Sequence, residues 1–69
     1  MQEYMIVIEK AGKNYSAYAP DIPGCGATGK TPDEAKKHLR EAIKFHLEGL
    51  AEDGFPMPEA TSIFDRIAV

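Results

Sequence analysis

The pattern of hydrophobic and polar positions near the start of the chain predicts a β-hairpin. The run from Tyr4 to Ile8 is apolar and rich in β-branched residues, which is typical of a strand covered on both faces. A short loop with Gly12 and Asn14 follows, and both residue types suit a tight turn. The stretch YSAYA then alternates in polarity up to Pro20, so we expect a second strand that ends there.

Turn residues dominate the next stretch, DIPGCGATG, and a helix start follows it. The Pro-Gly pair predicts a turn, and GATG is long enough for a short third strand that ends at Gly29. In the following TPDEA, Thr31 is a good N-cap, Pro32 fits the first helical position, and Glu34 stands where a capping box requires it. We therefore expect a helix to begin at Pro32.

A helical period extends from about Pro32 to Asp53 and predicts one helix about 33 Å long. One stripe of this helix carries its apolar positions together with one histidine: Ala35, Leu39, Ala42, Ile43, His46 and Leu50, with Leu47 at its edge. Such a stripe is typical of a helix packed on a sheet. Gly54 suits the residue that ends the helix.

Beyond the helix, the sequence predicts an extended exit and a last strand. The prolines of FPMPEA exclude a helix there. In TSIFDRIAV, Ile63, Ile67 and Val69 alternate with other residues, which favours a strand. The expected order β-β-β-α-β defines an α+β fold, with a three-stranded antiparallel sheet, one long helix packed on it and then a last strand, in a single domain over residues 1–69.

Composition adds an expectation of self-association. A chain of 69 residues buries a thin core, and domains of this size usually gain stability from disulfides, metals or association. Cys25 is the only cysteine and no Cys/His group has zinc spacing, so we expect a homodimer or a higher homo-oligomer. The few aromatic residues are expected to fill most of the core.

Charge and targeting patterns limit the expected partners and the expected location of the chain. The net charge of −3 lacks the basic footprint of a nucleic-acid surface, so direct DNA binding is not expected. The start MQEYMIVIEK has acidic residues and a short apolar run, unlike a signal peptide. No run reaches the roughly 20 apolar residues of a membrane span, so no membrane association is expected. One unpaired cysteine fits a reducing cytoplasm, which is the expected location.

Two linked motifs, PDIPGC and GKTPDEA, resemble the signature of the HicB family of antitoxins from toxin–antitoxin pairs. The positions that carry the resemblance are Pro20, Asp21, Ile22, Pro23, Gly24, Cys25, Gly29, Thr31, Glu34 and Ala35. The helix end AIKFHLEGLAEDG and the Pro-x-Pro exit at Pro56 and Pro58 also match the family pattern. The motif residues are expected to have a structural role, shaping the turn between strands and the start of the helix.

The resemblance implies a partially degraded RNase H-like fold that requires no cofactor and has no catalytic residues of its own. It implies that the chain binds and neutralises a small basic mRNA-cleaving toxin of the HicA type by occlusion. Many members of the family add a C-terminal DNA-binding module, which these residues do not include, so repression of the operon is not expected from them alone. A solitary HicB-like protein with another protein partner is an alternative.

Two enzymatic interpretations of the sequence are alternatives to the antitoxin interpretation. Metal-dependent RNase H chemistry requires converging carboxylates, and the candidates are Glu3, Glu9, Asp21 and Asp65. No spacing demands that they converge, and Asp21 in the turn can cap its own backbone. The string GCGATGKT, Gly24 to Thr31, is a literal match to a phosphate-binding loop, although a chain this short cannot supply the parallel nucleotide-binding fold that such a loop belongs to.

Three further residues have a functional and a structural interpretation. Cys25 is a nucleophile only if a base lies beside it and lowers its pKa; otherwise it is a small, semi-buried turn residue, which we favour. His46 lies within the apolar stripe, as a ligand or, as we favour, as a neutral core histidine. His38 lies off the stripe and is expected to be exposed.

The C-terminal end of the helix is acidic, against the direction of the helix dipole. Glu48, Glu52 and Asp53 stand there, where the negative end of the dipole disfavours carboxylates. This local cost motivates the hypothesis that these three residues help to dock a basic partner. The alternative is a solvated face supported by helical pairs such as Lys44–Glu48.

Overall fold

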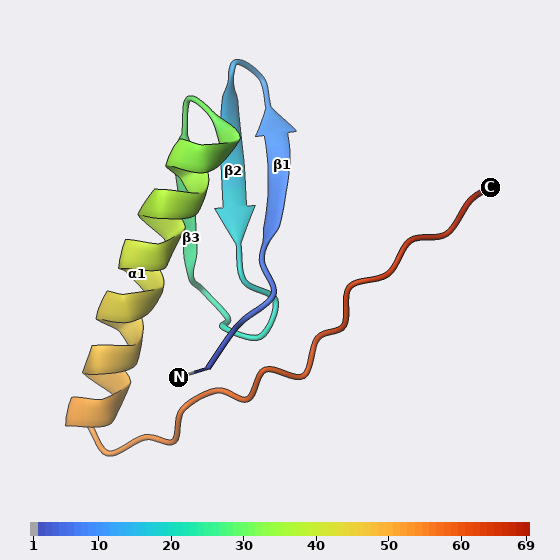
Figure 1. Cartoon of the computed structure of the whole chain (residues 1–69). Helices are drawn as coiled ribbons and strands as arrows, with labels where there is room; N and C mark the ends of the chain where they lie inside the picture. Colours follow the sequence, from blue (N-terminus) through green and yellow to red (C-terminus); the bar gives the residue numbers. More distant parts are fainter. Residues whose placement is uncertain (1) are drawn as a thin grey trace.

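The computed structural model describes residues 2–69 and has an α+β fold. Its elements are β1 (Val7–Ala11), β2 (Asn14–Tyr18), β3 (Gly26–Gly29) and α1 (Pro32–Glu52). The three strands form one antiparallel sheet in the order β1-β2-β3, and α1 packs on one face of it (Figure 1). The predicted hairpin, third strand and long helix are confirmed, although β1 begins at Val7 rather than at Tyr4.

Strand register decides which side chains face the helix. Ile8 pairs with Ala17, which in turn pairs with Ala27, so these three side chains share one face of the sheet. The buried core is Ala17, Ala19, Ile22, Cys25, Ala35 and Leu39. Among residues 2–69, only Ile22 and Leu39 are large and fully enclosed, so the core is thin and each of them matters for stability.

The start of α1 is fixed by its side chains and by the glycine before it. Thr31 Oγ1 accepts a hydrogen bond from the amide of Glu34 at 3.1 Å, and Glu34 Oε1 accepts one from the amide of Lys30 at 3.1 Å. The cap is thus reciprocal, as predicted, but it closes on the residue before the N-cap. Gly29 is buried against the first turn, where a Cβ would collide with the backbone nitrogen of Ala35.

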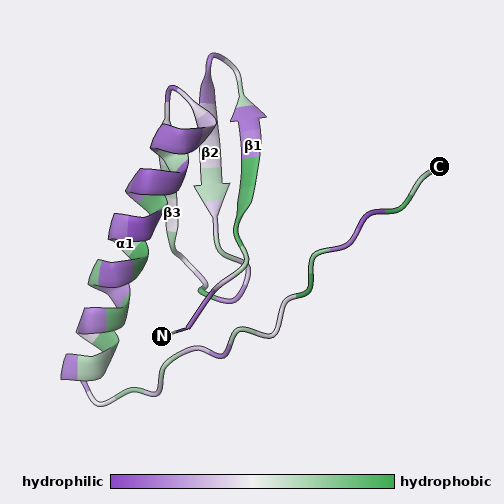
Figure 2. Cartoon of the chain, viewed as in Figure 1, coloured by the Kyte–Doolittle hydropathy of each residue, from purple (hydrophilic) through white to green (hydrophobic). Residues whose placement is uncertain are grey.

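The predicted stripe is the face with which α1 meets the sheet. Ala35 and Leu39 are fully buried, and Ala42, Ile43 and His46 are half-buried further along the helix. The remaining surface of α1 is mainly hydrophilic (Figure 2), with Phe45 as an exposed exception. Since the helix covers one face of the sheet only, Val7 on the other face is only half-buried, and the prediction that this strand is covered on both faces is wrong.

The predicted last strand is also wrong. Residues 55–69 have no regular secondary structure and form an extended segment, here called the tail, which crosses the end of the sheet and leads away from β1 (Figure 1). Ile63, Ile67 and Val69 are exposed instead of paired. An alternating sequence forms a strand only where its backbone finds a ladder partner, and the tail has no partner strand in this structure.

Candidate partner-binding site

The family motif forms a compact turn between β2 and β3. The amide of Ile22 donates to the carbonyl of Ala19 at 3.0 Å, and the amide of Cys25 donates to the carbonyl of Ile22 at 3.3 Å. Gly24 has φ of 79°, a conformation that glycine adopts without strain. The side chain of Ile22 is 1% exposed and closes the end of the core. The turn therefore positions Ile22 and the entry into β3.

Asp21 has a different role from the one expected. It does not cap its own turn but accepts three hydrogen bonds from the tail: from the Ser62 amide at 3.0 Å, Ser62 Oγ at 2.7 Å and Thr61 Oγ1 at 3.2 Å. The Ser62 amide, followed by the Ser62 hydroxyl, holds the pKa of this carboxyl below its ordinary value of 3.8. A contact between residues 40 apart leaves no local signal, so sequence reasoning could not find it.

A second hydrogen bond fastens the tail near the start of β1. The hydroxyl of Tyr4 donates to the carbonyl of Pro58 at 2.7 Å. Together with Asp21, it holds residues 58–62 against the end of the sheet. The tail is thus tied at two points, and residues 63–69 extend beyond the second.

Cys25 does not have the environment of a catalytic nucleophile. Its side chain is 8% exposed, and burial raises the pKa of the thiol, which favours the protonated form at neutral pH. His38 is exposed, as expected, and its Nδ1 donates to the carbonyl of Thr28 at 2.7 Å, since a carbonyl can only accept. The geometry therefore supports the structural interpretation of Cys25.

The carboxylates considered for metal chemistry lie in separate parts of the structure. Glu3 is exposed in the segment before β1, and Glu9 is exposed on β1 itself. Asp21 accepts hydrogen bonds from the tail, and Asp65 accepts one from the amide of Arg66 within the tail. Within residues 2–69, no group of three or more His, Cys, Asp or Glu side chains could hold a metal ion.

The string that matches a phosphate-binding loop does not form such a loop. Its central residues, Gly26 to Gly29, are β3 and pair with β2. A phosphate-binding loop requires free backbone amides between a strand and a helix. These residues instead pair with β2 in the sheet. The nucleotide-binding alternative therefore has no geometric support.

The acidic helix end is exposed and is accompanied by aromatic side chains. Glu48, Glu52 and Asp53, here called the acidic patch, are all exposed, and the last turn of α1 has no basic residue. Phe45 lies on the same helical face as Glu48 and is 78% exposed, and Phe55, just past the helix, is 58% exposed. The expectation that most aromatic residues fill the core is wrong. Besides these two, Phe64 and Tyr18 are exposed, at 68% and 42%, and the other two tyrosines are only partly buried against the core.

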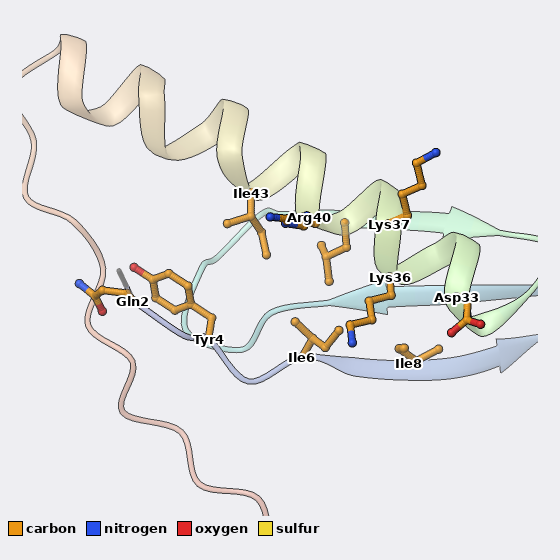
Figure 3. Close-up of a pocket in the computed structure, with 10 residues that line it drawn as sticks. Gln2, Tyr4, Ile6, Ile8, Asp33, Lys36, Lys37, Arg40 and Ile43 are labelled. Atoms are coloured by element: carbon orange, nitrogen blue, oxygen red, sulfur yellow. The ribbon is translucent and has the colours of Figure 1, made fainter.

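A groove between β1 and α1 is a second surface feature that the sequence did not reveal. The cavity is about 690 Å³ in volume, and it is lined by Gln2, Tyr4, Ile6, Ile8, Asp33, Lys36, Lys37, Leu39, Arg40 and Ile43 (Figure 3). Ile6 and Ile8 point from the first strand and the segment before it toward the helix, and Lys36 reaches from α1 toward them. The groove is therefore apolar at its base and basic along the helix.

The exposed aromatic side chains beside the acidic patch are of the kind that is enriched in protein–protein interfaces. Residues 4–68 match the family described as the HicB-like antitoxin of the bacterial toxin–antitoxin system. The chain belongs to this family.

Sequence relatives extend over most of the chain. A 14.9 kDa protein from the rep-hol intergenic region of Haemophilus phage HP1 is 43% identical over 60 residues, 87% of this chain, but the chain spans only 45% of that protein. A UPF0150 protein of Synechocystis sp. is 30% identical over 67 residues, covering 96% of this chain and 85% of that protein.

Two solved structures have the same fold. The N-terminal domain of the Burkholderia pseudomallei antitoxin HicB matches with a TM-score of 0.75 and 41% identity, over 84% of this chain and 69% of that one. A chain of the HicA3 and HicB3 toxin–antitoxin complex matches with a TM-score of 0.67 and 35% identity, over 86% of this chain and 72% of that one. Within residues 2–69, no helix has the length and apolar character needed to cross a membrane.

Proposed function

We propose that this chain is an antitoxin that binds a small basic, mRNA-cleaving toxin of the HicA type and neutralises it by occlusion. The observation that carries the proposal is the family match over residues 4–68, together with a structural neighbour from a HicA–HicB complex at 35% identity. Occlusion is the mode of neutralisation that we propose, because a protein bound over the toxin would deny RNA access to it.

The acidic patch is the surface that fits a basic toxin. Three exposed carboxylates at one end of α1 attract an oppositely charged protein and orient its approach. Phe45 and Phe55 beside them offer aromatic anchors of the kind that dominate binding energy in protein interfaces. A toxin that cleaves mRNA would be met in the cytoplasm, where we place the chain, and the net charge of −3 gives no support to DNA binding by these residues.

Charge reversal in the patch tests the proposed docking surface. With a HicA-type toxin from the same genome, Glu48→Lys together with Glu52→Lys should lower the association rate about tenfold and weaken its salt dependence. Glu9→Lys, an exposed carboxylate on the strand at the far end of the sheet, is the matched control and should change the rate little. Equal effects of both changes would refute docking at the acidic patch.

Binding as such is tested separately with the unmodified chain. A complex of chain and toxin that resists gel filtration, with RNA cleavage suppressed, supports the antitoxin. A toxin that remains free and active in the presence of the chain refutes it.

A further inference from the structure

The outer edge of β1 is open. In the strand order β1-β2-β3, β1 pairs with β2 on one side, and its other side faces no strand. An open edge presents backbone amides and carbonyls that are ready to pair with another extended segment. The edge is also continuous with the groove, because Ile8 belongs to β1 and lines the groove together with Ile6.

The groove exists because α1 lies mainly over β3 and β2 and leaves the β1 side of the sheet partly uncovered. Ile6, Ile8 and Ile43 are therefore half-buried around it. Lys36 and Arg40 add positive charge on the helix side. The chemistry that fits is an extended segment with aliphatic side chains and a carboxylate on one face.

Residues 63–69 of the tail have this chemistry. In an extended strand, Ile63, Asp65 and Ile67 share one face, and Phe64 and Arg66 share the other. Ile63 and Ile67 are 87% and 88% exposed, so the aliphatic face has no cover in the single chain. Asp65 between them supplies the carboxylate that the basic side of the groove attracts.

We propose that residues 63–69 of one chain add as an edge strand to β1 of a second copy, with Ile63, Asp65 and Ile67 facing the groove. The exchange is reciprocal, so that two copies form a closed dimer. It provides the ladder partner that the alternating tail lacks, and it covers the open edge and the groove of each copy at once. This assembly is independent of the proposed toxin binding, which uses the opposite, C-terminal end of α1.

The structure favours a second copy as the source of the strand. The bonds from Tyr4 and Asp21 fix the tail up to Ser62, and beyond that point it leads away from its own β1 (Figure 1). Direct pairing between two β1 edges is a competing arrangement. It would leave Ile63 and Ile67 of both tails exposed, whereas the exchange covers them.

Cross-linking between distinguishable chains tests the exchange. One tagged chain carries Glu9→Cys on β1 and a differently tagged chain carries Arg66→Cys in the tail; both positions are exposed and Cys25 is buried. With a short bis-maleimide, the mixture should give a cross-linked product that contains both tags. A cross-link formed only within a single chain carrying both substitutions would show that the tail docks on its own edge, and no cross-link at all would show a free tail; both results overturn the proposal.

Disruption of the tail face gives a second, independent measurement. Ile63→Asp together with Ile67→Asp should raise the dissociation constant of the dimer at least about tenfold in light scattering at graded concentrations. Phe64→Asp, which places a negative charge on the other face of the segment, is the control and should change the dissociation constant less. The helical circular dichroism signal should be unchanged in both variants, since all three side chains are exposed in the single chain. A wild-type chain that is monomeric at every concentration, or a dimer indifferent to the double substitution, contradicts the exchange.

Discussion

Residues 4–54 and the tail are held by different forces. The first region contains all of the buried core, and its strands and helix are held by ladder and helical hydrogen bonds, apart from the open outer edge of β1. The tail buries no residue fully, and side-chain hydrogen bonds from Tyr4 and Asp21 fix its position. Packing supports the first region and tethering supports the second, so damage to one should unfold the domain, whereas damage to the other should only release the tail.

Truncation of the central core residue should have the largest effect. Leu39→Ala removes one of the two large enclosed side chains, and we expect a loss of about 2–5 kcal/mol in the free energy of unfolding. Urea denaturation followed by circular dichroism measures this. Phe45→Ala, on the same helix but 78% exposed, is the control and should stay within about 0.5 kcal/mol of wild type. Similar losses in both variants would contradict the placement of the core.

The close approach at Gly29 gives the next largest effect. Gly29→Ala forces a methyl group into the backbone at the start of α1, 2.8 Å from the carbonyl carbon of Glu34, and we expect a loss of about 1–3 kcal/mol. Gly49→Ala, in open space within the helix, should instead stabilise the domain by about 0.5–1 kcal/mol. Thermal unfolding of both variants should therefore shift in opposite directions; a shift in the same direction would count against this contact.

Two threonines sharpen the comparison between the regions. Thr31→Ala removes the N-cap of α1 and should cost about 1 kcal/mol in the free energy of unfolding. Thr61→Ala removes a tail hydroxyl that donates to Asp21 and should leave the unfolding of the domain unchanged. If both substitutions lower the denaturation midpoint equally, the tail is part of the cooperative unit.

Asp21 should control the tail with the smallest effect on global stability. Asp21→Asn should speed amide exchange at Ser62 while leaving the core amides protected. Because the pKa of Asp21 is lowered in the folded chain, its hydrogen bonds persist at neutral pH and are lost as the pH falls through a value below 3.8. NMR signals of the tail should therefore shift with acid before those of α1; simultaneous shifts would contradict the tethering role.

The features that the sequence predicted correctly depend on residues close together in the chain, and those it missed depend on residues far apart. The cap at Thr31, the stripe from Ala35 to Leu50 and the helix end near Asp53 depend on residues within a few positions, and the structure confirms them to within one residue. The hairpin could also be predicted, since its turn and its alternating pattern are local.

What the sequence did not reveal depends on distant partners. The alternation of the tail predicts a strand, and the structure has none there, because a strand needs a ladder partner that no local pattern encodes. The hydrogen bonds that Ser62 donates to Asp21 and that Tyr4 donates to Pro58 join residues 41 and 54 apart. The groove arises from the lateral position of α1 on the sheet, which helical periodicity leaves open.

The most direct test of the account is a stoichiometric titration of toxin activity. The chain, used as bait in lysate of its own cells, should recover a small basic protein, and that protein is then purified and its cleavage of RNA measured as the chain is added. The account predicts that cleavage falls linearly to zero near a fixed molar ratio, while the chain alone cleaves nothing. Cleavage that continues at a large excess of the chain, or cleavage by the chain itself, would contradict an antitoxin that acts by occlusion.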